Sequence, residues 1–112
     1  MDKDIRTWLE DIRQSIEEIE GYFEPGRMIF EEYVNDTRTK RAVERNLEII
    51  GEAVVRILRK EEAFDIQNAR KIVGTRNRII HGYDAISDNL IWGIVVNHLP
   101  KLKIEVESLL VD

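Results

Sequence analysis

Arg76 and His81 are the two residues whose types and spacing best suit catalysis. A histidine titrates near neutral pH and can serve as a general acid or base. An arginine carries a permanent charge on a planar fork that matches phosphate. Asn77 and His81 are four residues apart, so on a helix they share a face and the amide can orient either group. The stretch predicts acid–base chemistry at a phosphodiester, with Arg76 and His81 catalytic and Asn77 and Arg78 supporting; it reads Arg76-Asn77-Arg78-Ile79-Ile80-His81-Gly82-Tyr83.

Charge is distributed unevenly along the chain. The formal net charge is −5, and residues 1–32 carry ten acids against four bases. Residues 66–83, in contrast, carry four bases and no acid: Arg70, Lys71, Arg76 and Arg78. A local excess of positive charge in an acidic protein is a candidate phosphate site. The alternative is that these bases pair with acids on neighbouring helices, and charge alone leaves both interpretations open.

Other candidates for chemistry are weaker. The chain has no cysteine, which excludes disulfides, thiolate metal sites and cysteine nucleophiles. Carboxylates of the first helix, such as Glu10 and Glu17, fit a solvated face better than a metal site, so we expect no metal and no cofactor. His98 lies between Asn97 and Leu99, which offer no cluster of polar partners. We therefore expect His98 to be structural or on the surface.

Helical periodicity indicates the elements that position these residues. Apolar residues three and four apart predict helices over residues 2–23, 26–34, about 37–60, 64–80 and from 87 onward, the last kinked at Pro100. Gly51, in the middle of the third helix, predicts a close crossing with another helix. No segment alternates as a strand does. The expected fold is all-α, an antiparallel bundle of four to five helices that forms a single domain over residues 1–112.

The sequence also suggests where the protein works. At 112 residues the chain suits one domain, and no apolar run approaches the roughly 18 residues of a membrane span. The first residues are charged where a signal peptide would turn apolar. We expect a cytoplasmic protein with no membrane partner.

The motif resembles a known signature. Arg76-Asn77-x3-His81-x-Tyr83 is similar to the R-polar-x3-H-x-Y pattern of HepT-like proteins, in the HEPN superfamily of nucleotide-binding helical domains. Flanking segments also resemble that family, from the opening Asp4-Ile5-x3-Leu9 through residues 45–53 to Trp92 and Leu99-Pro100-x-Leu102. The resemblance covers nearly the whole chain, and the motif itself shows no departure from the pattern.

The resemblance implies a specific biology. Such a protein is the toxin of a toxin–antitoxin module and a metal-independent RNA endonuclease. Two chains form a homodimer in which both R-x4-H motifs meet in one cleft. The cognate antitoxin is a minimal nucleotidyltransferase that adds AMP to the motif tyrosine, which is Tyr83 in this sequence. The chemistry agrees, because metal-free RNA cleavage needs a base and an acid, whereas one chain offers only one suitable group, His81.

Two other interpretations use the same residues. The chain could be a non-catalytic module that binds a nucleotide or presents a substrate to a nucleotidyltransferase, with Arg76 and Arg78 gripping phosphate. It could also be a structural bundle whose basic segment only forms salt bridges. An intact Arg76–His81 pair favours the enzyme, because a pure binder needs no titrating group beside its arginine.

Overall fold

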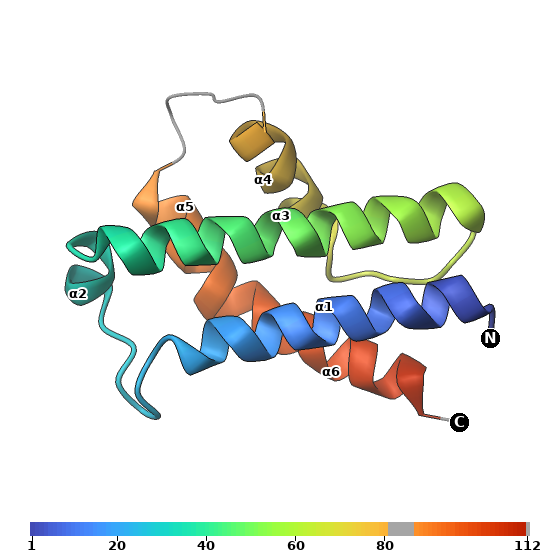
Figure 1. The fold of residues 1–112 in the computed structure, drawn as a ribbon, viewed down its shortest axis with the longest axis horizontal. Helices are drawn as coiled ribbons and strands as arrows, with labels where there is room; N and C mark the ends of the chain where they lie inside the picture. The colour runs from blue at the N-terminus through green and yellow to red at the C-terminus, as the bar shows by residue number, and fades with distance from the viewer. Residues whose placement is uncertain (81–86, 112) are drawn as a thin grey trace.

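The computed structural model describes residues 1–80 and 87–111, and every regular element in these ranges is helical (Figure 1). This confirms the expected all-α, HEPN-like bundle. In chain order the elements are α1 (Lys3–Gly21), α2 (Phe30–Val34), α3 (Thr37–Lys60), α4 (Arg70–Ile80), α5 (Asp88–Gly93), the π-helical turn η1 (Ile94–His98) and α6 (Leu99–Leu110).

An antiparallel pair, α1 and α3, forms the centre of the bundle (Figure 1). Asp2 caps α1 by accepting hydrogen bonds from the amides of Asp4 and Ile5, and Asp36 caps α3 by accepting from the amide of Thr39. Figure 1 shows α4 on the side of α3 away from α1, while α6 packs against α1. The helix that carries Arg76 therefore rests on α3.

The core follows the predicted apolar stripes. Buried side chains of α1, α3, α5, η1 and α6 form one cluster, which includes Ile5, Leu9, Ile12, Ile16, Val43, Leu47, Ile50, Val54, Ile91, Leu99, Leu102 and Val106. Burial of such side chains contributes about 1.5–3 kcal/mol each. At one end Trp92 meets Phe23, Phe30 and Tyr33, with ring centroids 5.2 to 5.9 Å apart, and this cluster docks the short helix α2.

Two predicted helices begin later than expected. Residues 26–29 are not helical, because Gly26 takes a left-handed turn with φ of 74° and α2 begins only at Phe30. Residues 64–69 are not regular helix either, and α4 begins at Arg70. There the carboxylate of Glu105 accepts hydrogen bonds from the backbone amides of Gln67 and Asn68 at 2.8 and 3.0 Å. A contact from α6 thus satisfies backbone groups that a longer helix would have used.

The last predicted helix is continuous from Asp88 to Leu110 but not uniform. The π-helical turn η1 ends at His98, two residues before Pro100, and an interruption of this kind bends helices. Proline lacks the amide proton that a regular α-helix would use at this point. The expected single element across Pro100 is therefore found, with α-helix on both sides of the π-helical turn.

Candidate active site

Arg76 is held in place by a carboxylate of α3. Its Nη2 donates to Oε2 of Glu52 in an ion pair, and its Nη1 donates to Oδ1 of Asn77 at 3.0 Å. The arginine side chain is only 19% exposed, so it has little freedom. Its buried Nε finds no hydrogen-bond partner in the part of the chain that the structure describes. Among the described residues, each terminal nitrogen donates one hydrogen bond, which leaves its second N–H without a described partner.

Gly51 makes this arrangement possible. A Cβ built on Gly51 would lie 2.6 Å from Cβ and 2.9 Å from Cδ of Arg76, so any larger residue would displace the arginine. The close helix crossing expected at Gly51 is therefore confirmed, and it occurs between α3 and α4. The residue after this glycine, Glu52, is thereby brought to the guanidinium.

Glu52 accepts hydrogen bonds from two arginines. Its Oε1 accepts from Nε of Arg56 at 3.2 Å, while Oε2 takes Arg76. Partial burial acts to raise the pKa of Glu52, but the hydrogen bond from Arg56 and the charge of Arg76 outweigh it and hold the pKa below its ordinary value. Glu52 is therefore ionised at neutral pH and balances the charge of Arg76.

The other bases of this region stay uncommitted. Arg70, Lys71 and Arg78 are exposed on α4 and form no ion pair with any residue in 1–80 or 87–111. Asn77 is exposed beside them. Charge alone left open whether the four bases of residues 66–83 bind phosphate or pair with neighbouring helices. One of them, Arg76, pairs with a neighbouring helix, and the other three face solvent. Three exposed cations without a described partner are what a phosphate-binding surface requires.

His81 and Tyr83, the predicted catalytic histidine and the predicted modification site, lie outside the described residues. The described part of α4 ends at Ile80. Of the four predicted catalytic and supporting residues, the structure brings Arg76 and Asn77 into contact and places Arg78 on the same helix.

Sequence reasoning gave Glu52 no role. It occurs within the segment that resembles the family, directly after the glycine expected at a crossing. A carboxylate next to a small residue at a helix crossing is a usable signal for an arginine partner, since the crossing helix must pass close to it. This signal does not identify which basic residue of the crossing helix pairs with the carboxylate.

A hollow of about 250 Å³ opens beside Arg76. It is lined by a stripe of α3, by Trp8 and Asp11 of α1, and by Arg76 of α4. The contributing residues of α3 are Arg45, Glu48, Ile49, Glu52, Ala53 and Arg56. We call it the Trp8 hollow.

A second polar hollow surrounds His98, which is half-buried at the end of η1. Lys71 of α4 lines it together with Asn89 and Asn97, so polar groups do gather around this histidine. The sequence neighbours of His98 gave no sign of this cluster, because Lys71 arrives from a distant segment.

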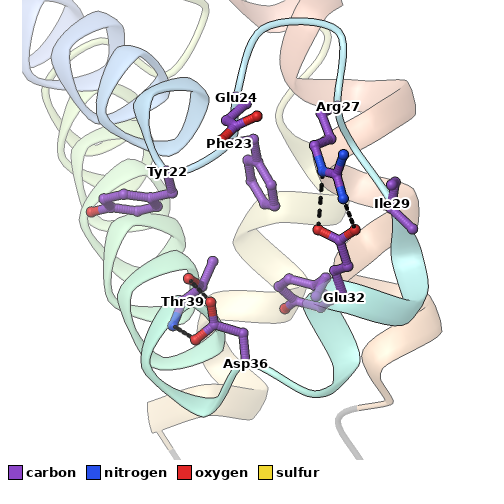
Figure 2. Close-up of a pocket in the computed structure, with 9 residues that line it drawn as sticks. Tyr22, Phe23, Glu24, Arg27, Ile29, Glu32, Asp36 and Thr39 are labelled. Carbon is purple, nitrogen blue, oxygen red and sulfur yellow. Dashed lines mark hydrogen bonds and ion pairs between the residues drawn. The ribbon is translucent and has the colours of Figure 1, made fainter.

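A third hollow, of about 150 Å³, lies at the far end of the bundle (Figure 2). Three of its charged groups already have partners, since Arg27 binds Glu32 at 2.9 Å and Asp36 accepts from the amide and hydroxyl of Thr39. Burial raises the pKa of Tyr33, whose hydroxyl has no partner among the described residues. The paired charges serve the turn and the cap of α3, and we do not assign chemistry to this hollow.

The described ranges, 1–80 and 87–111, hold neither a candidate metal site nor a candidate membrane span. No three His, Asp or Glu side chains in these ranges lie where together they could hold a metal ion. Within the same ranges, no helix combines the length and the apolar character needed to cross a membrane.

Comparison with known proteins identifies the class to which this helical bundle belongs. The family model for ribonuclease HepT-like proteins matches residues 12–109. The chain therefore belongs to the ribonuclease HepT-like family, which confirms the expected family and the expected enzyme class, a ribonuclease.

Individual relatives span nearly the whole chain. A Methanocaldococcus jannaschii protein, named a "putative RNase", is 34% identical, with 98% of this chain and 90% of the relative covered. A second protein of that organism with the same kind of name is 36% identical, with 94% and 95% covered. A Thermococcus cleftensis protein named "probable ribonuclease HepT" is 33% identical, with 97% and 98% covered. No solved structure matches the chain.

Proposed function

We propose that this protein is a metal-independent RNA endonuclease in which Arg76 and His81 carry out the cleavage. The observation that supports the proposal best is the state of Arg76. Its guanidinium is fixed by Glu52 and Asn77, and the second N–H on each terminal nitrogen has no partner among the described residues. A fixed fork with two such donors is suited to clamp the non-bridging oxygens of a phosphate.

The chemistry follows from the groups that the segment supplies. One imidazole takes the proton from a ribose 2′-hydroxyl, and the oxygen attacks the adjacent phosphorus. A second imidazole gives a proton to the 5′-oxygen as its bond to phosphorus breaks. Arg76 stabilises the negative charge that builds on the phosphate oxygens in the transition state. The products are a 2′,3′-cyclic phosphate and a free 5′-hydroxyl.

Because one chain offers a single suitable imidazole, we propose a homodimer in which two 76–83 segments form one composite site. A two-fold axis would supply His81 and Arg76 twice. Sedimentation at micromolar concentration is expected to show a dimer. A monomer with full activity would contradict the composite site and leave the ribonuclease assignment standing.

We further propose that the RNA strand follows α4. Arg70, Lys71 and Arg78 lie exposed on that helix and pair with no described residue. Their charges are free to replace the counterions of an RNA backbone, which is the main source of sequence-independent affinity.

The proposed biological role is that of a toxin in a toxin–antitoxin module. A minimal nucleotidyltransferase antitoxin would attach AMP to Tyr83, and the added anion would then occupy the space of the RNA phosphate near Arg76 and Arg78. Expression of the chain alone should arrest growth, and co-expression of the neighbouring nucleotidyltransferase should relieve the arrest. Equal growth with and without the chain would contradict the toxin role.

The direct test of the activity is incubation of the purified protein with RNA in the presence of EDTA. Cleavage should persist and should stop when the substrate carries 2′-deoxyribose at the cut, since the attacking hydroxyl is then missing. Loss of cleavage in EDTA, restored by a divalent cation, would contradict the metal-independent mechanism.

A further inference from the structure

The Trp8 hollow adjoins Arg76, the residue proposed to bind the scissile phosphate. Arg76 itself forms part of the lining, on the side of α4. A phosphate bound to the remaining N–H groups of Arg76 would therefore have its own nucleoside at the mouth of the hollow. At about 250 Å³ the hollow is smaller than the roughly 300–1,000 Å³ of a site for a drug-sized molecule. It suits a single ring system.

The lining is polar but carries no net charge. Three carboxylates, of Asp11, Glu48 and Glu52, stand against three guanidiniums, of Arg45, Arg56 and Arg76, so the formal charges cancel. Such a lining gives a free phosphate no general advantage. It offers both donors and acceptors to a neutral heterocycle.

The lining also provides apolar surface. Trp8 is half-buried and lines the hollow, together with Ile49 and Ala53 of α3. Stacking of a base on an aromatic side chain contributes about 1–3 kcal/mol in single-stranded nucleic-acid complexes. Unpaired RNA bases are commonly stacked on aromatic side chains and hydrogen-bonded along their edges, and the hollow offers groups for both.

Asp11 supplies the feature that would distinguish among bases. Asp11 is exposed, lines the hollow and makes no hydrogen bond or ion pair with any residue that the structure describes. An ionised carboxylate only accepts hydrogen bonds. Adenine, cytosine and guanine carry an exocyclic amine that can donate to it, and uracil does not.

We infer that the Trp8 hollow is a base-binding subsite of the ribonuclease, which receives the unpaired base next to the scissile phosphate and prefers bases with an exocyclic amine. The inference rests on the proposed function in one respect, that Arg76 binds the scissile phosphate. The subsite gives the enzyme a means of sequence preference that the motif segment alone does not supply.

Tryptophan fluorescence tests the subsite without any cleavage. The chain has two tryptophans, and Trp92→Phe leaves Trp8 as the sole reporter. Adenosine monophosphate, tested as the 3′- and the 5′-phosphate, should quench Trp8 saturably in at least one form. Uridine monophosphate should bind about tenfold more weakly, which corresponds to about 1.4 kcal/mol.

Asp11→Asn separates this subsite from a general stacking surface. Replacing Trp8 risks unfolding because it contacts the core, whereas Asp11 is exposed. Asp11→Asn should reduce the adenine preference to less than threefold, and Glu62→Gln, an exposed acid outside the hollow, should leave it unchanged. Arg76→Ala should weaken the binding of every nucleotide tested.

The outcomes are distinct from those that test catalysis. Absence of quenching by every nucleotide, or equal affinity for adenosine and uridine monophosphates, would overturn the inference even if RNA is cut. Saturable, adenine-selective quenching by a protein that cuts no RNA would support the subsite and contradict the proposed ribonuclease mechanism.

Discussion

A Cβ at Gly51 would lie 2.6 Å from Cβ of Arg76, so α3 and α4 cross with the arginine stem against bare backbone. Contacts under 3.0 Å cannot be tolerated without a shift, and the nearest atoms belong to the base of the side chain rather than to its flexible end. The position of the guanidinium thus depends on a residue that itself carries no functional group.

Gly51→Ala should therefore destabilise the protein and displace Arg76. Overpacking of this kind costs about 1–3 kcal/mol. The matched control is Gly74→Ala on α4, where an added Cβ has nothing within 4 Å and should be neutral or stabilising by up to about 1 kcal/mol. Urea denaturation measures both variants. Equal stability of the two variants would show that the crossing is looser than described.

Glu52→Gln should hold the Arg76 side chain less firmly and change how the stability of the protein depends on pH. A carboxylate whose pKa is lowered by folding stabilises the native state above its unfolded pKa, and this contribution is lost as pH falls through the folded pKa. The difference in the free energy of unfolding between wild type and Glu52→Gln should be full above pH 4.5, the ordinary pKa of a glutamate. This difference should shrink below that pH.

The control for this variant is Glu44→Gln, also on α3, whose partner Arg41 is largely exposed. Glu44→Gln should leave RNA cleavage unchanged. Glu52→Gln should lower kcat and change KM less, because the Arg76 side chain is then held less firmly against the transition state. An unchanged kcat for Glu52→Gln would mean that Arg76 needs no help from Glu52.

The exposed cations of α4 should determine the salt dependence of RNA binding. Changing Arg70, Lys71 and Arg78 to Ala should weaken binding and make the slope of log K against log salt shallower by about 0.7 for each phosphate that the variant no longer neutralises. The control is a triple change at Lys3, Arg59 and Lys101, which removes the same charge from exposed positions elsewhere. Similar slopes for the two triple variants would place the RNA away from α4.

Tyr83→Phe tests regulation. Incubation with the partner nucleotidyltransferase and ATP should add the mass of AMP to the wild type and silence its cleavage, while Tyr83→Phe should escape both effects. Mass spectrometry and an RNA assay on the same samples provide the measurement. Modification and silencing of the Tyr83→Phe protein would place the AMP on another residue.

The sequence predicted the helical core well, because apolar spacing reports directly on which face of a helix is buried. The stripes of α1 and α3 and the crossing at Gly51 agree with the structure. The predicted start of α4 was wrong, because the carboxylate of Glu105 accepts hydrogen bonds from backbone amides that the apolar spacing assigned to a helix. Contacts between distant segments are invisible to periodicity.

The same limit applies to the site. The motif residues were recognisable because they lie close together along the chain, so Arg76, Asn77 and Arg78 could be proposed from spacing. Glu52 and Trp8 come from other helices, 24 and 68 positions away from Arg76, and their relation to it depends on the packing of α1, α3 and α4. Only the fold shows that they share one hollow.

The most direct test of the central claim is RNA cleavage in EDTA by the wild type, Arg76→Ala and His81→Ala, with helicity measured on the same samples. We expect the wild type to cut and His81→Ala to be inactive with unchanged helicity. Arg76→Ala should lose roughly 2–4 kcal/mol of transition-state stabilisation, with partial rescue by Arg76→Lys. Full cleavage by a folded His81→Ala protein would contradict the account.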